Sequence, residues 1–575
     1  MALNWVTDLR SGHAAGPRIK EYVGLSDRMG GSALSLPPTP ERSNGRYRSR
    51  AEAGLPSPEQ IAVSRDFARG HFLENLATKD TPLSVGEVRA ILQHPTIKLT
   101  LSGYKNGIVP ASPNPESSYS RFFWVRDGVA CNTALAWNGI RDRAAMSITA
   151  MAENYASAEQ RGRFVSFVLD SDAPSRFRAH RDVPLIRLAI NSETGALGGE
   201  VTQPDGSVTS SLDWGHSQID ALGAFFWQVF HFARAHAVHG SPPVINMNEL
   251  QAALLKVNPD EQIESIFVVM LKGMQKFGFN TAPCFGAWED TRAVARASSN
   301  AQCLAGFLAM KKWLEDERQA GVREAPLKTV PGDGIQERES FEYLLHLVDS
   351  CITLARTTLN LRIPDFPSAF ARECDLNGLE RDAALLFALY PIEIGLSEFQ
   401  RDAILRTVYP LMGEVGFKRF PNDPYVGGGY INQPHPHFMA DTNHRDFRPA
   451  EWGLFDAILA AYYFRCYTNS GGLDEEAYYL GDRHVKRSIL TLTPHDYAYK
   501  LKTNGAEVRI PPGSAPEAWS YHPSLGGWVP VHNSPLNWAT SMLSLALERS
   551  LLAAVMHARA STRVKPRSVS FGDCG

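Results

Sequence analysis

Apolar residues recur at helical spacing along most of the chain after about residue 57. Residues three and four positions apart share one face of a helix, so this spacing predicts helices with one buried side. The expected helices lie near residues 128–139, 143–157, 218–237, 248–257, 262–276, 294–315, 340–360, 380–390, 452–466 and 536–556. Strand-like patterns are weak and are limited to short pieces near residues 185–190 and 508–510.

A further helix is expected to begin at Ser57. Serine is a favoured N-cap residue, Pro58 then occupies the first helical position, and apolar residues follow as far as Phe72. The sequence therefore predicts that regular structure starts here.

The residues before this point, from about Gly30 to Pro56, are rich in Ser, Pro, Gly and Arg. Such a composition cannot bury enough apolar surface to offset the entropy lost on ordering. We therefore predict a flexible N-terminal segment over residues 1–56, one large domain over residues 57–560 and a C-terminal tail over residues 561–575.

Between the expected helices lie long loops that are dense in Gly, Pro, Trp and His. No short internal repeat is visible, which disfavours a solenoid of small repeats. We expect an all-α domain, and specifically a helical toroid whose loops gather at one end.

The composition, 44% hydrophobic and 21% charged, is that of a globular protein. A net charge of -3 argues against a nucleic-acid partner, because phosphate binding needs a concentrated excess of Lys and Arg. The longest continuous apolar stretches, such as residues 221–226, are too short to cross a bilayer. We expect neutral or weakly polar substrates, and neither a nucleic-acid nor a membrane partner.

The cysteines carry no sign of a disulfide framework. All 7 are scattered singly, without paired metal-ligand spacing. The first residues, MALNWVTDLRSGHAAG, lack the basic segment and continuous apolar run of a secretory signal. A reduced, cytoplasmic protein is the simplest interpretation.

Two glutamates stand beside tryptophan in distant motifs, Glu289 in FGAWED and Glu517 in APEAWSY. Two carboxyl groups facing one another across a cleft are what hydrolysis of a glycosidic bond requires. We interpret Trp288 as an apolar wall that keeps Glu289 protonated, with Glu517 as the ionised partner that activates water. With 61 Asp and Glu in the chain, ordinary surface or capping glutamates that happen to adjoin tryptophan remain the alternative.

A second candidate segment is GIVPASPNPESSYSRFFWVRDG, residues 107–128. Arg126 and Asp127 offer hydrogen-bond donors and an acceptor for sugar hydroxyls, and Trp124 offers a flat apolar face. The alternative is an Arg–Asp pair that only caps the next helix.

A third segment, LDWGHSQIDALGAFFWQVF, covers residues 212–230. Gln218 and Asp220 lie at the expected start of a helix with Trp214 just outside it, so an amide, an acid and an indole are expected to face one cavity. Alternatively, Asp220 only complements the dipole of the first helical turn.

The fourth segment is a long loop before an apolar helix, within residues 418–464, and it contributes Arg419 and Asp423. It also contains glycines at 427–429 and a group of possible zinc ligands, His435, His437, Asp441 and His444. No regular element fixes the spacing of that group, so we expect no metal there. The glycines lack the strand-to-helix context of a phosphate loop, and we expect no cofactor.

Taken in order, these motifs resemble a known family. The series GIVPASP…FFWVRD, DWGHSQID, FGAWED, RFPND, PEAW and PLNWATSMLSLAL is similar to the glucoamylase-type glycoside hydrolases of family 15. DWGHSQIDA and FGAWED are also similar to the α and β subunits of phosphorylase kinase. The resemblance runs from about Val85 to His557.

The resemblance implies an (α/α)6 toroid of the six-hairpin glycosidase type, with the active site where the inner helices begin. It implies that Glu289 is the general acid and Glu517 the general base of an inverting reaction. The positions that it assigns to sugar binding are Trp124, Arg126, Asp127, Trp214, Gln218, Asp220, Trp288, Asp290 and Arg419.

The chain departs from the family pattern at three places. Asp290 stands where glucoamylases often have a second glutamate, which puts affinity for the next sugar in doubt. The tyrosine expected near the base is ambiguous between Tyr119 and Ser120. The late motif is PEAW rather than the commoner PEQ.

Two functions follow from the resemblance. The first is a glucoamylase-like hydrolase that releases glucose from the non-reducing ends of α-linked oligo- or polysaccharides. The second is a weakly active or inactive regulatory subunit of the phosphorylase kinase type that binds glycan or a protein partner.

Overall fold

The computed structural model describes most of the predicted domain. The described residues are 53–61, 64–180, 182–234, 242–289, 293–322, 327–329, 340–425, 448–500, 507–522 and 526–563. Of the predicted N-terminal segment, only residues 53–56 are described, and there Ala53 and Leu55 are buried. Outside the described residues lie Asp290, the loop glycines 427–429, and the possible zinc ligands His435, His437, Asp441 and His444.

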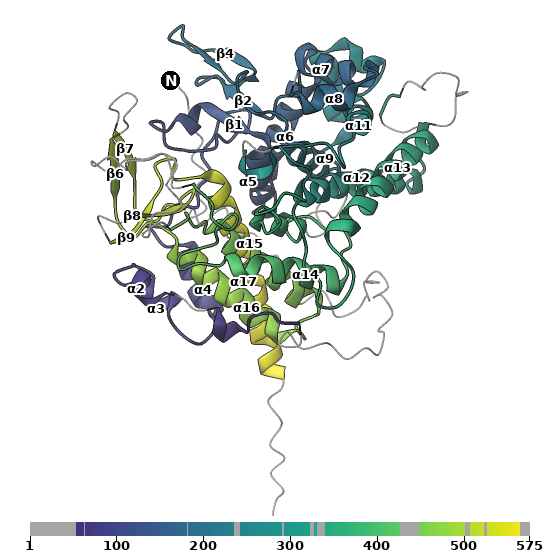
Figure 1. Cartoon of the computed structure of the whole chain (residues 1–575). Helices are drawn as coiled ribbons and strands as arrows, with labels where there is room; N and C mark the ends of the chain where they lie inside the picture. Colours follow the sequence, from purple (N-terminus) through teal and green to yellow (C-terminus); the bar gives the residue numbers. More distant parts are fainter. Residues whose placement is uncertain are drawn as a thin grey trace, which may run out of the picture.

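The described chain is predominantly helical, as predicted (Figure 1). Its α-helices are α2 (Arg65–Ala68), α3 (Glu74–Ala77), α4 (Val85–Leu92), α5 (Val125–Trp137), α6 (Arg141–Ala156), α7 (Ala158–Leu169), α8 (Ala173–Arg178), α9 (Ile219–Phe232), α10 (Met247–Val257), α11 (Ile266–Phe277), α12 (Ala297–Gln319), α13 (Ser340–Arg362), α14 (Glu398–Val408), α15 (Leu454–Asn469), α16 (Glu475–Leu490) and α17 (Asn537–Arg563). Its 3-10 helices are η1 (Pro58–Gln60), η2 (Ser118–Arg121), η3 (Pro259–Gln262), η4 (Gly286–Trp288), η5 (Ala383–Ala388) and η6 (Tyr409–Leu411).

An inner ring of helices forms the centre of the molecule. Neighbouring members contact one another in the order α5, α9, α12, η5, α15 and α17, and α17 closes the ring on α5. Outer helices cover it: α4 packs on α17, α6 on α5, α13 on α12, α14 on η5 and α16 on α15. The ring of Phe267 on α11 packs on rings of α9. Outer and inner elements thus alternate along the described chain, which is the predicted (α/α)6 arrangement.

The sequence explains which helices lie inside. In α9 and α15 nearly every side chain is buried, and a helix that is apolar on all sides must be surrounded by protein. Helices from the two ends of the described domain meet, since α4 lies beside α17 (Figure 1).

Helix α17 is longer and more apolar than the sequence pattern suggested. Among the described residues it contains one stretch, Asn537–Ser561, that is long and apolar enough to cross a membrane, with a mean hydropathy of 1.3. In the fold, 67% of the most apolar 18-residue window of that stretch is buried inside the protein, since α17 belongs to the inner ring.

The segments between the helices contain short antiparallel sheets. Strands β1 (Phe122–Trp124), β2 (Arg187–Ile190) and β3 (Leu197–Gly198) form a three-stranded sheet, in which Trp124 pairs with Arg187. The two-stranded pairs are β4 (Glu200–Thr202) with β5 (Val208–Ser210), β6 (Tyr497–Lys500) with β7 (Glu507–Ile510), and β8 (Trp519–His522) with β9 (Gly527–Pro530). Both predicted strand pieces are therefore confirmed, as parts of β2 and β7.

At two places the structure has a different type of element from the predicted α-helix. The helix expected from Ser57 to Phe72 is instead η1 and the short α2, because Ile61 (ψ 74°) and Arg69 (ψ 123°) leave the helical conformation and end the two elements. The helix expected at residues 380–390 is the 3-10 helix η5, whose six residues are all buried.

Candidate active site

Most of the predicted site residues lie where an inner-ring element begins. Arg126 and Asp127 lie in the first turn of α5, and Gln218 and Asp220 lie at the start of α9. The loops before α12, α15 and α17 supply Trp288 and Glu289, Arg419, and Glu517, respectively. Hydrogen bonds and ring contacts between these segments bring the eight residues together at one end of the ring.

Glu289 is held by two N–H donors from other segments. The indole Nε1 of Trp124 donates to Glu289 Oε1 at 2.5 Å, and Gln218 Nε2 donates to the same oxygen at 3.1 Å. The backbone of Glu289 is left-handed, with φ 56°, a conformation that is costly for a residue with a Cβ and is concentrated at functional sites. The carboxylate is therefore held by the loops before α5 and α9 as well as by its own.

The structure corrects the expected contact between Trp288 and Glu289. The Trp288 indole is buried and donates from Nε1 to Asp382 Oδ1 at 2.7 Å, and its ring packs on Trp452, 5.5 Å between centroids. The indole that contacts Glu289 is that of Trp124, which the sequence could not pair with it because the two residues are 165 positions apart.

Glu517 is buried among polar groups. Tyr425 donates its hydroxyl to Glu517 Oε2 at 3.0 Å, and the backbone N–H of Glu517 donates to Ser534 Oγ. Burial raises the pKa of Glu517 to about 7, a hydrogen bond from Asn533 opposes the rise, and the charge of Glu289 adds to it. Desolvation therefore acts on Glu517, the residue that the sequence suggested as the ionised partner.

Arg126 organises the acids at the start of α5 and α9. Its Nη1 donates to Gln218 Oε1 and Asp220 Oδ2, both at 3.2 Å, and its Nη2 lies 3.6 Å from Asp127 Oδ1. Burial raises the pKa of Asp127 to about 7, against the opposing effect of Arg126. The charges of Glu289 and Glu517 both raise it further, so the two glutamates act on one shared carboxyl group.

Tyr119, rather than Ser120, lies among these acids. Its ring packs on Trp124 at 4.8 Å, and its pKa is raised by burial and then by the charges of Glu517 and Glu289. Ser120 instead donates its hydroxyl to the backbone carbonyls of Pro115 and Ser117. The structure therefore favours Tyr119 as the tyrosine of the site.

Arg419 is fixed by an acid four residues further on. Its Nε and Nη2 donate to the two carboxylate oxygens of Asp423 at 2.6 and 2.7 Å, a bidentate pair in which Asp423 is fully buried. The guanidinium lies 4.7 Å from the centroid of the Tyr425 ring and 5.8 Å from that of Trp288. Arg419 thus joins the wall formed by Trp288, close to the tyrosine that contacts Glu517.

Trp214 lies on the outer side of Trp124. The two ring centroids are 6.2 Å apart, at nearly a right angle. A guanidinium that the sequence analysis did not single out, that of Arg187, lies 4.1 Å from the Trp214 ring centroid.

Four neighbours escaped the sequence analysis: Asp382, Tyr425, Arg187 and Trp538. Tyr425 and Trp538 carried a weak signal, since one follows Asp423 closely and the other lies in the motif PLNWAT. Asp382 and Arg187 lie in no recognisable motif, and their roles depend on contacts across the fold.

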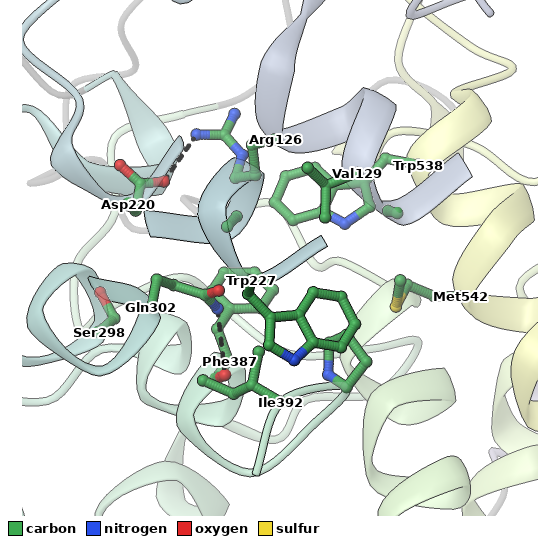
Figure 2. Close-up of a pocket in the computed structure, with 13 residues that line it drawn as sticks. Arg126, Val129, Asp220, Trp227, Ser298, Gln302, Phe387, Ile392, Trp538 and Met542 are labelled. Atoms are coloured by element: carbon green, nitrogen blue, oxygen red, sulfur yellow. Dashed lines mark hydrogen bonds and ion pairs between the residues drawn. The ribbon is translucent and has the colours of Figure 1, made fainter. Parts of the chain in front are cut away.

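Below these charged groups, the ring axis contains a small cavity (Figure 2). It encloses about 40 Å³, room for a very few water molecules. Arg126 and Asp220 line it together with side chains of the inner ring, which include Val129, Trp227, Gln302, Phe387, Trp538 and Met542. Side chains of five inner-ring elements, α5, α9, α12, η5 and α17, thus meet around this cavity.

Within the part of the chain that the structure describes, no group of three or more His, Cys, Asp or Glu residues is arranged to hold a metal ion.

Solved structures with a similar fold are glycosidases and glucoamylases. A wild-type glycosidase has 16% sequence identity and a TM-score of 0.47, over 85% of this chain and 99% of that one. A glucoamylase from Saccharomycopsis fibuligera has 12% identity and a TM-score of 0.43, over 82% of this chain and 91% of that one. A bacterial glucoamylase complexed with acarbose has 13% identity and a TM-score of 0.42, over 79% of this chain and 55% of that one.

No protein-family model matches the chain, and no curated protein matches its sequence. The similarity to phosphorylase kinase subunits stays a prediction.

Proposed function

We propose that the protein is an inverting glycoside hydrolase that releases glucose from the non-reducing ends of α-linked glucosides. The observation that carries this proposal is the placement of Glu289 and Glu517. They come from loops before different inner helices, yet both act electrostatically on Asp127 and Tyr119. Two carboxyl groups around one polar pocket are the minimal machinery for cleaving a glycosidic bond with acid and base.

In this mechanism Glu289 donates a proton to the departing glycosidic oxygen. Trp124 and Gln218 fix the carboxyl oxygen Oε1 and so orient the acid. As the bond breaks, the anomeric carbon gains positive charge, and the carboxylate of Asp127 stabilises it. Arg126 and Asp220 remain as partners for the hydroxyls of the terminal sugar.

Glu517 takes a proton from the attacking water on the opposite face of the sugar. Tyr425 donates to Glu517 Oε2, and Asn533 also hydrogen-bonds the side chain, so the two together orient the carboxylate that accepts the proton of the water. Inversion requires the two carboxyl groups to be about 6.5–9.5 Å apart, so that the water fits between base and sugar. The first product is then the β-anomer of glucose.

Replacing either acid with its amide tests the assignment. Glu289→Gln and Glu517→Gln keep the size of each side chain and should each lower kcat on maltooligosaccharides at least about 100-fold. NMR of the first minutes of the reaction should show β-glucose.

Full activity in either variant, or α-glucose as the first product, contradicts the mechanism. Retained binding of α-glucans without any hydrolysis by the wild-type protein would favour the regulatory alternative instead.

A further inference from the structure

Arg187 reaches the site because of the register of a small sheet. It pairs with Trp124 across the antiparallel strands β1 and β2, and cross-strand partners project from the same face. The adjacent pair, Phe123 and Leu188, projects to the opposite face and is buried. The strand pairing therefore places the Arg187 side chain beside the indole that holds Glu289.

Three aromatic rings surround the guanidinium. Its central carbon lies 3.6 Å from the ring centroid of Phe122, 4.1 Å from that of Trp214 and 5.3 Å from that of Trp124. Rings at these distances attract a cation, and they also hold the planar group in one orientation. Arg187 is thus positioned rather than free to move.

Arg187 has no hydrogen-bond or ion-pair partner among the residues that the structure describes, and its Nε is buried. Other arginines near the site are paired: Arg126 with Asp220, and Arg419 with Asp423. Burial lowers the pKa of Arg187, while the charges of Glu289 and Asp213 oppose that change. A partly buried guanidinium that finds no acceptor among the described residues can bind an anionic ligand.

The position of Arg187 determines which part of a bound substrate its guanidinium would contact. Glu289 donates its proton to the oxygen of the leaving group, so the leaving group must lie against Glu289. Trp124, which holds Glu289, is the same ring that Arg187 covers. The sugar-binding groups Arg126 and Asp127 come instead from the first turn of α5, on the inner ring.

We infer that Arg187, with Trp124 and Trp214, forms a leaving-group subsite that takes a glycoside whose aglycone carries a carboxylate. The guanidinium fork matches a carboxylate with two parallel hydrogen bonds, and the rings suit a flat or apolar body beside it. This inference rests on the proposed function.

Arg187 takes no covalent part in the reaction. The bond between the anomeric carbon and the glycosidic oxygen breaks, the proton of Glu289 moves to that oxygen, water adds to the carbon, and Glu517 takes the proton of the water. The acidic aglycone leaves as its free alcohol, still bearing the carboxylate that Arg187 holds.

The experiment compares 4-carboxyphenyl α-D-glucoside with its methyl ester, which lacks the negative charge. Arg187→Gln should lower kcat/KM for the carboxylate by about 10-fold to 100-fold relative to the wild type, and for the ester by less than about 3-fold. An equal loss on both substrates overturns the inference, because it would show that Arg187 only supports the sheet. Asp213→Asn is the control: it removes an exposed charge that acts on Arg187, and should leave kcat/KM for the ester unchanged.

A binding measurement separates this inference from the proposed function. 4-Hydroxybenzoate should quench tryptophan fluorescence of the wild-type protein, and Arg187→Gln should weaken its binding at least about 10-fold. If the wild-type protein hydrolyses neither glucoside nor maltooligosaccharides but this difference is found, the proposed function fails and the anion subsite stands. Absent binding, or equal binding to both proteins, overturns the subsite.

Discussion

At the scale of single residues, the candidate acids depend on partners that are distant in sequence. Glu289 adjoins Trp288 in the chain, but its carboxylate is held by Trp124 and Gln218. Hydrogen bonds to a charged group are among the stronger single contacts in a protein, at about 1.5–3 kcal/mol each. The behaviour of Glu289 should therefore depend more on Trp124 than on its own neighbour.

Removing the indole N–H of Trp124 tests that dependence. Trp124→Phe keeps a ring in place but loses the donor to Glu289, and we expect about a 10-fold fall in kcat/KM on maltotriose. Trp313→Phe is a matched control, since the Trp313 indole N–H is buried without a hydrogen-bond partner in the described structure and packs on Phe230, away from the acids. Similar losses in the two variants would show a general effect of replacing tryptophan.

The pH dependence of the reaction should report the burial of Glu517. A base can accept a proton only when ionised, and burial raises the pKa of Glu517 to about 7. We therefore expect kcat/KM to rise with pH through about 7, measured between pH 5 and 8 at low substrate concentration. A rate that is already constant above pH 5 contradicts this role.

At the scale of elements, two glycines allow the backbones of α9 and α12 to approach closely. Gly223 on α9 and Gly306 on α12 face one another, and a Cβ added at Gly223 would lie 2.6 Å from the backbone carbon of Gln302. No side chain fits in this space without moving one helix. Gly223 and Gly306 therefore set the spacing of α9 and α12.

Gly223→Ala should lower the free energy of unfolding by about 1–3 kcal/mol, because the two helices must separate. Gly162→Ala is the control: this exposed glycine lies on outer helix α7 with no atom within 4 Å of an added Cβ. There the change should stabilise the protein by about 0.5–1 kcal/mol. Urea unfolding of the two variants measures both effects, and equal midpoints would contradict the proposed close contact.

The spacing of apolar residues did not predict the outer helix α16, because this helix buries charged side chains. In α16, Lys486 is fully buried, where it pairs with Asp482 and donates to the carbonyls of Lys79 and Thr81. Arg487 of the same helix pairs with the buried Asp456 of α15. A buried ion pair looks polar in the sequence, so periodicity alone did not predict α16.

At the scale of the whole molecule, several carboxyl groups lie buried in the interior, and burial raises their pKa values. These values are about 7 for Asp127, Glu451 and Glu517, about 8 for Glu373 and about 6 for Asp382. A carboxyl group with a raised pKa holds its proton longer in the folded state than in the unfolded one. It stabilises the fold fully below the unfolded pKa, and this contribution is lost as the pH rises through the folded pKa.

Buried histidines act in the opposite direction at lower pH. Burial lowers the pKa of His71, His216, His231 and His532 to about 4, so their unfavourable contribution disappears as the pH rises to about 6.5. Above that pH these histidines no longer contribute a change, whereas the buried carboxyl groups with a pKa of about 7 or 8 still do.

We therefore expect the melting temperature to fall between about pH 6.5 and 8. Glu451→Gln keeps an oxygen to accept the backbone N–H groups of Val415 and Gly416 but cannot ionise, so its melting temperature should fall less over the same range. Thermal unfolding followed by circular dichroism tests both curves. Parallel curves for the two proteins would contradict the contribution of Glu451.

The sequence by itself determined the helical class, because the spacing of apolar residues around a helix is a local property. It also determined the chemical types in the loops, since the motifs around Arg126, Asp220, Glu289 and Glu517 can be recognised without coordinates. Only the tertiary structure decided that Trp124 holds Glu289, that Glu517 is desolvated, and that Arg187 meets no acceptor among the described residues. These depend on burial and on contacts between segments far apart in the chain, and a local pattern contains neither.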